Sequence, residues 1–224
     1  VECVEGIGEA SKHLSFPVVS GNVSFYNQTK EVGIKPTPVI GGVGLIKDYN
    51  KMITMDFKDE GNLILIIGKT EGHLDQSLFA RTILDEKNGP PPEVNLFNEK
   101  NNGETILKLV EDDYIKSAHD VSLGGILIGI SKMCIKGNIG IELKKPKSLL
   151  SEFEYFLSED QGRYIIEISK SDIKKVTDIL EKNAVHYDEI GILNGNSISF
   201  NEKTIVPIDE LTSYNSNWLT DYMS

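Results

Sequence analysis

The sequence predicts an α+β fold, and three observations support this prediction. Segments with helical periodicity alternate irregularly with short segments rich in β-branched residues, whereas a doubly wound parallel sheet needs a regular alternation. The Asn-Gly-Asn turn at 194–196 is typical of an antiparallel hairpin. Hydrophobic residues make up 39% of the 224 residues, which is enough apolar material for a substantial core.

Residues 1–56 are expected to hold one helix followed by two strands. Four apolar residues recur on one face of the first helix: Val1, Val4, Ile7 and Leu14. The strands are expected at 17–20 and 38–46, on either side of a polar turn. The chain begins with Val1 rather than Met, and no N-cap residue precedes the helix. We therefore expect the sequence to be a piece of a longer protein.

The polar segment 58–62 is the strongest candidate for a domain boundary, so we expect one domain over 1–56 and a second over 57–224. In the second domain, an apolar strand is expected at 62–68 and a helix at 75–86. The Asn-Gly-Pro-Pro-Pro run that follows is expected to be an extended loop, because proline lacks the N–H that a helix needs.

The later elements follow from hydrophobic periodicity. The inward residues of a helix at 99–115 are expected to be Ile106, Leu107, Leu109 and Val110. Those of an amphipathic helix at 172–182 are expected to be Ile173, Val176, Ile179 and Leu180. The other expected elements are a strand at 116–121, a helix at 122–135 capped by Ser122, and strands at 139–143, 163–169, 186–193, 197–200 and 203–206.

The bulk properties exclude several classes of function. The net charge is −11, and a surface this negative repels both nucleic acid and anionic membranes, so neither is expected as a partner. Apolar runs such as 63–67 are too short to span a bilayer, and no secretory or transit segment is recognisable. Cys3 and Cys134 are the only cysteines, and they indicate reduced thiols in a cytoplasmic protein.

The segment 16–27 combines three groups that suit a magnesium phosphate. Gly21 has no side chain, so a phosphate can approach the backbone N–H closely. The side-chain oxygen of Asn22 is a neutral ligand of the kind that Mg²⁺ accepts. The hydroxyl of Ser24 can donate a hydrogen bond to a substrate oxygen. Composition alone favours the simpler interpretation, a strand that ends in a polar turn.

The segment 117–125 forms a second candidate site. A strand is expected to end at Asp120, and the next helix has Gly124 and Gly125 in its first turn. A helix N-terminus offers unpaired N–H groups and partial positive charge to a phosphate, and Asp120 would supply a carboxylate to Mg²⁺. His119 could bind a ligand or position Asp120. Spacing alone favours a capped helix beside a buried, satisfied histidine.

The segment 157–163 (Leu-Ser-Glu-Asp-Gln-Gly-Arg) is the third candidate. Its structural interpretation is a packed turn in which Arg163 pairs with a carboxylate, and its functional interpretation is the rim of a nucleotide site. A charge run before a strand is more often a solvated surface. The sequence contains no signature of a zinc protease, a redox dithiol, a serine hydrolase or a P-loop.

Together these strings resemble one enzyme family. SGNVSFYN, AHDVSLGG and LSEDQGRYIIEI, in this order, are similar to the closing third of phosphoribosylformylglycinamidine synthase, and HLDQSLFARTIL and NGPPPEVNLFNEKNNGETI resemble its smaller bacterial form. The resemblance covers essentially the whole chain. It implies that 1–56 is the end of the second ATP- and substrate-binding domain. Residues 57–224 would be a complete C-terminal-type domain of the aminoimidazole ribonucleotide synthetase-like superfamily, with a mixed or antiparallel sheet and helices.

The resemblance also implies an activity. Members of the family are ligases of purine biosynthesis that use ATP and Mg²⁺ to activate the amide oxygen of formylglycinamide ribonucleotide. Ammonia then displaces phosphate and gives formylglycinamidine ribonucleotide. In the small bacterial form a separate glutaminase subunit makes the ammonia from glutamine, and a small third subunit bridges the two. These subunits are the partners that the resemblance implies.

The family pattern assigns roles to individual residues. Gly21 matches an ATP-binding glycine, Asn22 a magnesium ligand and Ser24 a substrate-binding serine. His119, Asp120, Gly124 and Gly125 match a corner that holds metal and phosphate in the superfamily. Leu123 stands where the family usually has an acidic residue, and Asp75 where it usually has glycine, and both differences weaken the case for that corner.

The resemblance leaves two alternatives open. The family's catalytic histidines lie in a part that this sequence lacks, so no catalytic residue is assigned and we expect the chain to be inactive alone. One alternative is a non-catalytic half that holds a nucleotide for stability and docks the glutaminase subunit. The other is a small-molecule kinase of the same superfamily, which the match across the Pro-rich loop disfavours.

Overall fold

The computed structural model describes residues 1–22, 27–35 and 37–224, with only the backbone of Thr204. The chain divides into two compact units, Val1–Tyr49 and Asn50–Ser224. None of the helices among the described residues combines the length and the apolar character that crossing a bilayer requires. Both cysteines are free, as predicted, and burial raises the pKa of the Cys134 thiol to about 12.

The first unit contains helix α1 (Glu2–His13) and a short antiparallel hairpin of β1 (Gln28–Thr29) and β2 (Val32–Gly33). The predicted strands at 17–20 and 38–46 are absent, so that prediction was wrong. A strand needs a hydrogen-bonded neighbour, and the described residues of this unit place none beside these two segments. Their apolar side chains are correspondingly exposed, with Val19 at 90% and Val43 at 94%.

The second unit is built on one mixed sheet, which confirms the predicted α+β class. Among the described residues its strand order is β4-β6-β3-β7-β5-β8-β9. Each neighbouring pair is antiparallel except β5 and β8, which are parallel. The strands are β3 (Leu63–Ile67), β4 (Ile115–Asp120), β5 (Ile141–Leu143), β6 (Tyr164–Ile168), β7 (Tyr187–Leu193), β8 (Ser197–Phe200) and β9 (Lys203–Pro207).

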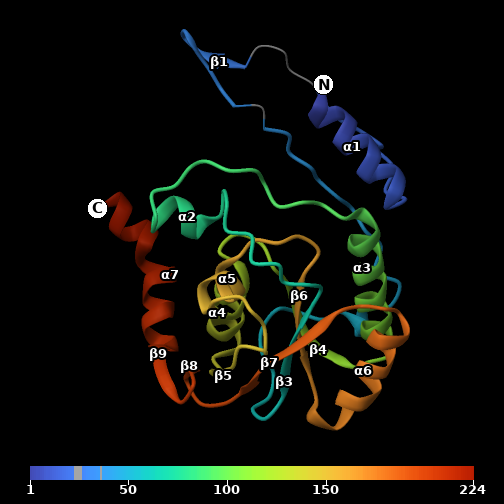
Figure 1. Ribbon diagram of the computed structural model, residues 1–224, viewed down its shortest axis with the longest axis vertical. Coiled ribbons are helices and arrows are strands. Elements are labelled where there is room, and N and C mark those ends of the chain that lie inside the picture. Colours follow the sequence, from blue (N-terminus) through green and yellow to red (C-terminus); the bar gives the residue numbers. More distant parts are fainter. Residues whose placement is uncertain (23–26, 36) are drawn as a thin grey trace. The chain divides into compact units, whose positions relative to one another are not determined.

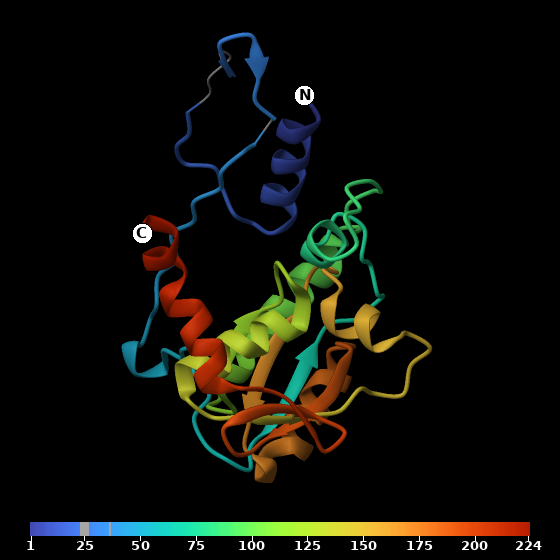
Figure 2. The same cartoon turned by 90° about the vertical axis from the view of Figure 1, so that its left-hand side faces the viewer.

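Helices cover both faces of this sheet. Figure 1 shows α3 (Leu96–Glu111) and α6 (Ile173–Lys182) on one side of the strands. Helices α4 (Gly125–Gly137), α5 (Glu152–Leu157) and α7 (Ile208–Met223) lie on the other, and in Figure 2 the red helix α7 lies in front of the strands. Each layer encloses its own hydrophobic core.

The interior strand β3 shows why this arrangement follows from the sequence. Ile64 and Ile66 pack into the core beside α4 and α5, whereas Leu63, Leu65 and Ile67 pack into the core beside α3 and α6. Because successive side chains point to opposite faces, a strand covered on both faces is apolar at every position. The unbroken apolar run predicted as a strand is therefore the strand buried on both sides.

The inward residues predicted for α3 and α6 are confirmed with one exception. In α6, Val176 and Leu180 are fully buried and Ile173 and Ile179 are partly buried, as predicted. In α3, however, Leu107 is 64% exposed, so its inward assignment was wrong. The buried residues of α3 are spaced three and four apart, which leaves position 107 on the solvent side: Asn102, Thr105, Ile106 and Leu109.

Two predictions about local elements were also wrong, and two helices were not predicted. The turn 194–196 does not close a hairpin, because β5 lies between β7 and β8 in the sheet. The helix predicted at 75–86 is only α2 (Leu78–Thr82), since Gln76 and Asp85 adopt left-handed backbone angles on either side of it. Helices α5 and α7 were not predicted, although α5 begins with a complete capping box from Ser151 to Glu154.

Candidate functional site

The sheet topology brings three segments of the sequence to one end of the second unit. Strands β3 and β4 are both antiparallel to β6, so they run in the same direction. Their carboxyl ends therefore lie beside the start of β6. As a result, the loop 68–77 after β3, the predicted site 117–125 at the end of β4 and the predicted site 157–163 before β6 lie next to one another.

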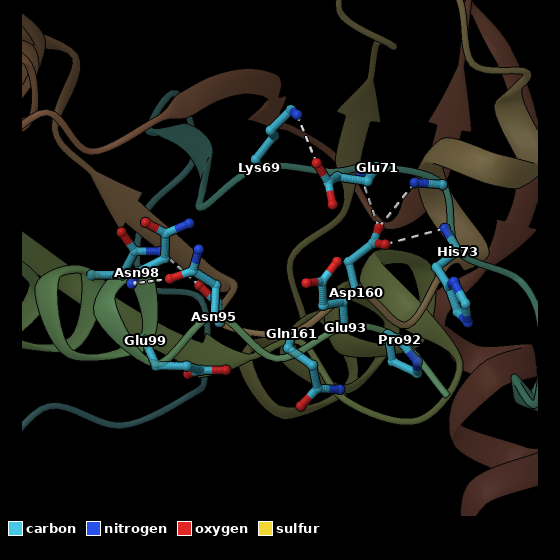
Figure 3. Close-up of a pocket in the computed structure, with 13 residues that line it drawn as sticks. Lys69, Glu71, His73, Pro92, Glu93, Asn95, Asn98, Glu99, Asp160 and Gln161 are labelled. Atoms are coloured by element: carbon cyan, nitrogen blue, oxygen red, sulfur yellow. Dashed lines mark hydrogen bonds and ion pairs between the residues drawn. The ribbon is translucent and has the colours of Figure 1, made fainter. Parts of the chain in front are cut away.

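A cavity of about 540 Å³ lies at this end of the sheet. In Figure 3 the loop after β3 lies on one side of it, helix α3 on another, and the turn before β6 between them. Its volume falls within the range of small-molecule sites. The residues that line it are Lys69, Glu71, Gly72, His73, Pro92, Glu93, Asn95, Asn98, Glu99, Asn102, Asp160, Gln161 and Gly162.

Asp160 holds the loop after β3 in place. Its carboxylate accepts hydrogen bonds from the backbone N–H groups of Glu71 at 3.0 Å, Gly72 at 3.1 Å and His73 at 3.1 Å (Figure 3). The residue is only 6% exposed. A buried carboxylate that accepts several backbone bonds is a rigid support, so one wall of the cavity has a fixed shape.

Arg163 lies beneath this turn and is 2% exposed. Its guanidinium donates to the carbonyl oxygens of Asp160 at 3.1 Å and Ser158 at 2.7 Å, and to the hydroxyl of Thr70 at 3.0 Å. Its Nη1 also lies 3.7 Å from the Asp160 carboxylate. The structural interpretation of the third segment, a packed turn with Arg163 paired to a carboxylate, is therefore confirmed.

Glu159 occupies the N-terminal end of α4. One of its carboxylate oxygens accepts from the backbone N–H of Gly124 at 2.8 Å and from that of Leu78 at 2.7 Å. The helix begins at Gly125, and its N-cap is Gly124 in a left-handed conformation with no side-chain cap, so the predicted cap by Ser122 was wrong. The backbone carbonyl of Ser122 instead accepts from Gly125 at 3.0 Å.

His119 and Asp120 lie together at the end of β4. The Nδ1 of His119 lies 2.6 Å from the backbone oxygen of Asp120 and 3.1 Å from its carboxylate. The His119 side chain is 11% exposed and that of Asp120 68%. Both line a shallow, mostly apolar hollow with Ile106 and Tyr164. Within the described ranges, no three His, Cys, Asp or Glu side chains are grouped so that they could hold a metal ion.

Gly125 provides a test of how tightly this corner is packed. Its φ is +67°, and a Cβ there would lie 2.5 Å from the carbonyl oxygen of Ser158. We expect Gly125→Ala to lower the free energy of unfolding by about 2–3 kcal/mol, from left-handed strain plus this clash. Gly195→Ala is the matched control, because φ is +65° but no atom lies within 4 Å. Urea unfolding of both variants measures the difference. Gly195→Ala should lower the free energy of unfolding by about 1 kcal/mol, and equal losses in the two variants would contradict the packing argument.

The first predicted site belongs to the other unit. Gly21 and Asn22 are both exposed, and a Cβ on Gly21 would meet no atom within 4 Å. Ser24 lies outside the described residues. The roles of these three residues therefore remain predictions.

The N-terminal turn of α3 was not predicted, because this helix was expected to begin at Glu99. Its first residue is Leu96, and the side chain of Asn95 caps it by accepting from the N–H of Asn98 at 3.0 Å. This places Glu99 in the wall of the cavity, half-buried, and burial raises the pKa of its carboxyl group. An asparagine at the start of an apolar-periodic segment is a recognised N-cap signal, and it was available in the sequence.

Comparison with known proteins gives close relatives over the whole chain. The PurL subunit of phosphoribosylformylglycinamidine synthase from Pelagibacter ubique (strain HTCC1062) is 67% identical over 223 residues, which is 100% of this chain and 30% of that protein. The same subunit from Azorhizobium caulinodans is 39% identical over the same shares. The chain thus spans 30% of the length of these curated relatives.

Solved structures share the fold. A structure of PurLQS from Thermotoga maritima matches with a TM-score of 0.59 and 19% identity, over 73% of this chain and 28% of that chain. T. maritima PurL complexed with FGAR matches with a TM-score of 0.61 and 20% identity, over 73% of this chain and 30% of that one. Residues 59–200, which include all the strands of the mixed sheet up to β8, match the family model described as AIR synthase related protein, C-terminal domain. The chain belongs to this family.

Proposed function

We propose that this chain forms part of a phosphoribosylformylglycinamidine synthase. This ligase uses ATP and glutamine-derived ammonia to convert formylglycinamide ribonucleotide to formylglycinamidine ribonucleotide, ADP and phosphate in purine biosynthesis. The observation that carries the proposal is the 67% identity to the P. ubique PurL subunit over 223 residues. The T. maritima structures share the fold at only 19–20% identity, so the fold by itself does not require so close a match.

The proposal assigns residues 1–56 to the end of the second ATP- and substrate-binding domain and 57–224 to the C-terminal-type domain. Within the first, Gly21 would contact ATP, Asn22 would bind Mg²⁺ and Ser24 would contact the substrate. The exposure of Gly21 and Asn22 is consistent with these roles, because a ligand can reach both. Structures of T. maritima PurL complexed with ATP and with FGAR support nucleotide and substrate binding by the whole enzyme.

Asn22 fits a magnesium site as one neutral ligand among several. Protein-bound Mg²⁺ usually has one or two carboxylate ligands as well as nucleotide phosphates. Among the described residues, no three His, Cys, Asp or Glu side chains are grouped so that they could hold a metal ion. The proposal therefore assigns the carboxylates to other parts of the enzyme, and the bound metal would neutralise phosphate charge. This chain would orient the phosphate at Gly21 and the substrate at Ser24, and it would be inactive alone.

The proposal includes the partners as well. The solved PurLQS structure from T. maritima supports an assembly of the ligase with two further components, which would be the glutaminase and the bridging subunit. A second candidate role is a non-catalytic half that holds nucleotide for stability and docks the glutaminase. One observation weighs against this role, and it concerns the corner at His119, Asp120, Gly124 and Gly125. A phosphate there would compete with the Glu159 carboxylate for the N–H of Gly124.

A chimera tests the two roles. This chain replaces the matching segment of the P. ubique PurL subunit, and ADP release is measured with ATP, Mg²⁺, ammonium and formylglycinamide ribonucleotide. We expect ADP release that depends on both ammonium and formylglycinamide ribonucleotide. In the Asn22→Ala chimera, turnover per folded molecule should fall at least tenfold. The control is Asn217→Ala, an exposed asparagine on α7. Full turnover of the Asn22→Ala chimera with reduced stability would favour the non-catalytic role, and a chimera that folds but is inactive would contradict the proposal.

A further inference from the structure

The cavity of about 540 Å³ is lined by polar groups, some with a hydrogen-bond partner in the protein and some without. Several of its polar groups are already paired within the protein. The ammonium of Lys69 lies 2.6 Å from the Glu71 carboxylate at the exposed rim, so these two charges offset each other. The Asp160 carboxylate accepts three backbone N–H groups, as described above. The Nε2 of His73 is bound to the carbonyl of Pro90 at 3.0 Å.

The exposed amides of Asn95 and Asn98 keep donors as well as acceptors. Two other amides of the lining offer mainly acceptors. The amides of Asn102 and Gln161 use their NH₂ groups on backbone carbonyls, Gly162 at 2.9 Å and Glu159 at 3.3 Å. Their carbonyl oxygens accept no hydrogen bond from any described residue. Asn102 is only 6% exposed, but its carbonyl oxygen is not fully enclosed, so a ligand in the cavity can reach it. A ligand that donates hydrogen bonds would satisfy these oxygens.

Glu99 adds a negative charge to this set. Among the described residues it has no ion-pair or hydrogen-bond partner, and burial raises the pKa of its carboxyl group. Gly162 makes room for it, because a Cβ on Gly162 would lie 3.2 Å from the Glu99 carboxyl carbon. In Figure 3, Glu99 lies on helix α3 and Gln161 on the turn before β6, and both line the cavity. A half-buried carboxylate without a cation favours a ligand that brings one.

We propose that this cavity binds a small molecule through a cationic nitrogen group with several N–H donors, an amidinium or an ammonium, and that Glu99 is its counter-ion. The acceptors of Asn102 and Gln161 would take the remaining N–H groups. An anion such as phosphate is disfavoured, because Glu93 and Glu99 would repel it and Lys69 is already paired. A divalent metal is disfavoured as well, since the described residues provide no group of three metal-binding side chains.

This chemistry has a place in the proposed reaction, in which ammonia is consumed and an amidine is formed. That connection rests on the proposed function. Binding of the cation itself does not, because it needs no ATP, no substrate and no turnover. Cation binding and the proposed function can therefore be contradicted separately.

The test is a titration of the 224-residue chain with acetamidinium chloride, with ammonium chloride and, at equal ionic strength, with sodium chloride. Backbone ¹⁵N–¹H shifts report the binding site. We expect saturable shifts at Gln161, Gly162 and the N-terminal turn of α3 with at least one of the nitrogen cations, and no saturation with sodium. Saturation with ammonium alone would show that the cavity binds an ammonium group. Saturation with acetamidinium would show that it binds an amidinium group.

Two variants make the assignment specific. Glu99→Gln keeps the shape of the side chain and should weaken binding at least tenfold. Glu104→Gln removes a charge from the same helix but outside the cavity, where Glu104 lies near Lys100, and should leave binding unchanged. Thermal unfolding checks that both variants are folded. The proposal is overturned if neither nitrogen cation saturates, if sodium saturates equally, or if the two variants weaken binding to the same extent.

Discussion

Replacing Arg163 with methionine is expected to lower the free energy of unfolding by about 3–5 kcal/mol. Arg163 is 2% exposed, and its guanidinium donates to three oxygens, those of Ser158, Thr70 and Asp160. Methionine fills similar volume but donates nothing, so two buried carbonyls lose their partner and the Asp160 carboxylate loses its nearest cation. Urea unfolding followed by circular dichroism would measure the loss as a lower midpoint with an unchanged slope.

Arg81→Met is the matched control for this change. Arg81 is the only other arginine in the chain, it is exposed, and its side chain makes one hydrogen bond, to the carbonyl of Ser77 at 3.3 Å. We expect that variant to lose less than about 1 kcal/mol, as surface substitutions usually do. Arg163→Lys should fall between the two, because a single ammonium cannot reach all three acceptors. A loss below 1 kcal/mol for Arg163→Met would show that the turn 158–163 does not depend on the arginine.

The role of Arg163 also shows what could be predicted from the sequence. An arginine three residues after Asp160 and directly before an apolar strand indicated a packed, charge-paired turn, and the structure confirms it. The sequence did not reveal that this turn supports a cavity wall. That depends on β6 lying between β3 and β4, and strand order is a long-range property that local patterns do not contain.

The difference between local sequence patterns and long-range strand order also explains the predictions that were wrong. The turn at 194–196 has the composition of a hairpin turn, but β5 is inserted between the two strands that it joins. The predicted strands at 17–20 and 38–46 have β-branched residues but no neighbour to pair with among the described residues of their unit. Strand propensity is therefore realised in β3 and β6, where both sheet partners and two cores exist, and not in the first unit.

Removal of the Glu167 carboxylate should have an effect similar in size to the loss of Arg163. Glu167 lies in β6 and is 0% exposed. It accepts from the backbone N–H groups of Lys58 at 3.0 Å and Asp59 at 3.1 Å, and from the side chains of Asn62 and Ser117, both at 2.7 Å. This one group therefore attaches the polar segment 58–62, the predicted domain boundary, to strand β6.

We expect Glu167→Leu to lower the free energy of unfolding by about 3–5 kcal/mol, because four donors lose their acceptor and Ser117, at 0% exposure, cannot reach water. Glu167→Gln keeps one carbonyl acceptor and should recover part of the loss. The control is Glu189→Leu on β7. The Glu189 side chain is 38% exposed and, among the described residues, pairs only with Lys144 at 2.6 Å, so this change should cost less than about 1 kcal/mol. Chemical denaturation would measure all three variants.

Faster amide exchange at Lys58 and Asp59 in Glu167→Leu alone would show that the carboxylate holds the segment 58–62 on the sheet. Unchanged exchange at these two residues would mean that the segment is held by its other contacts.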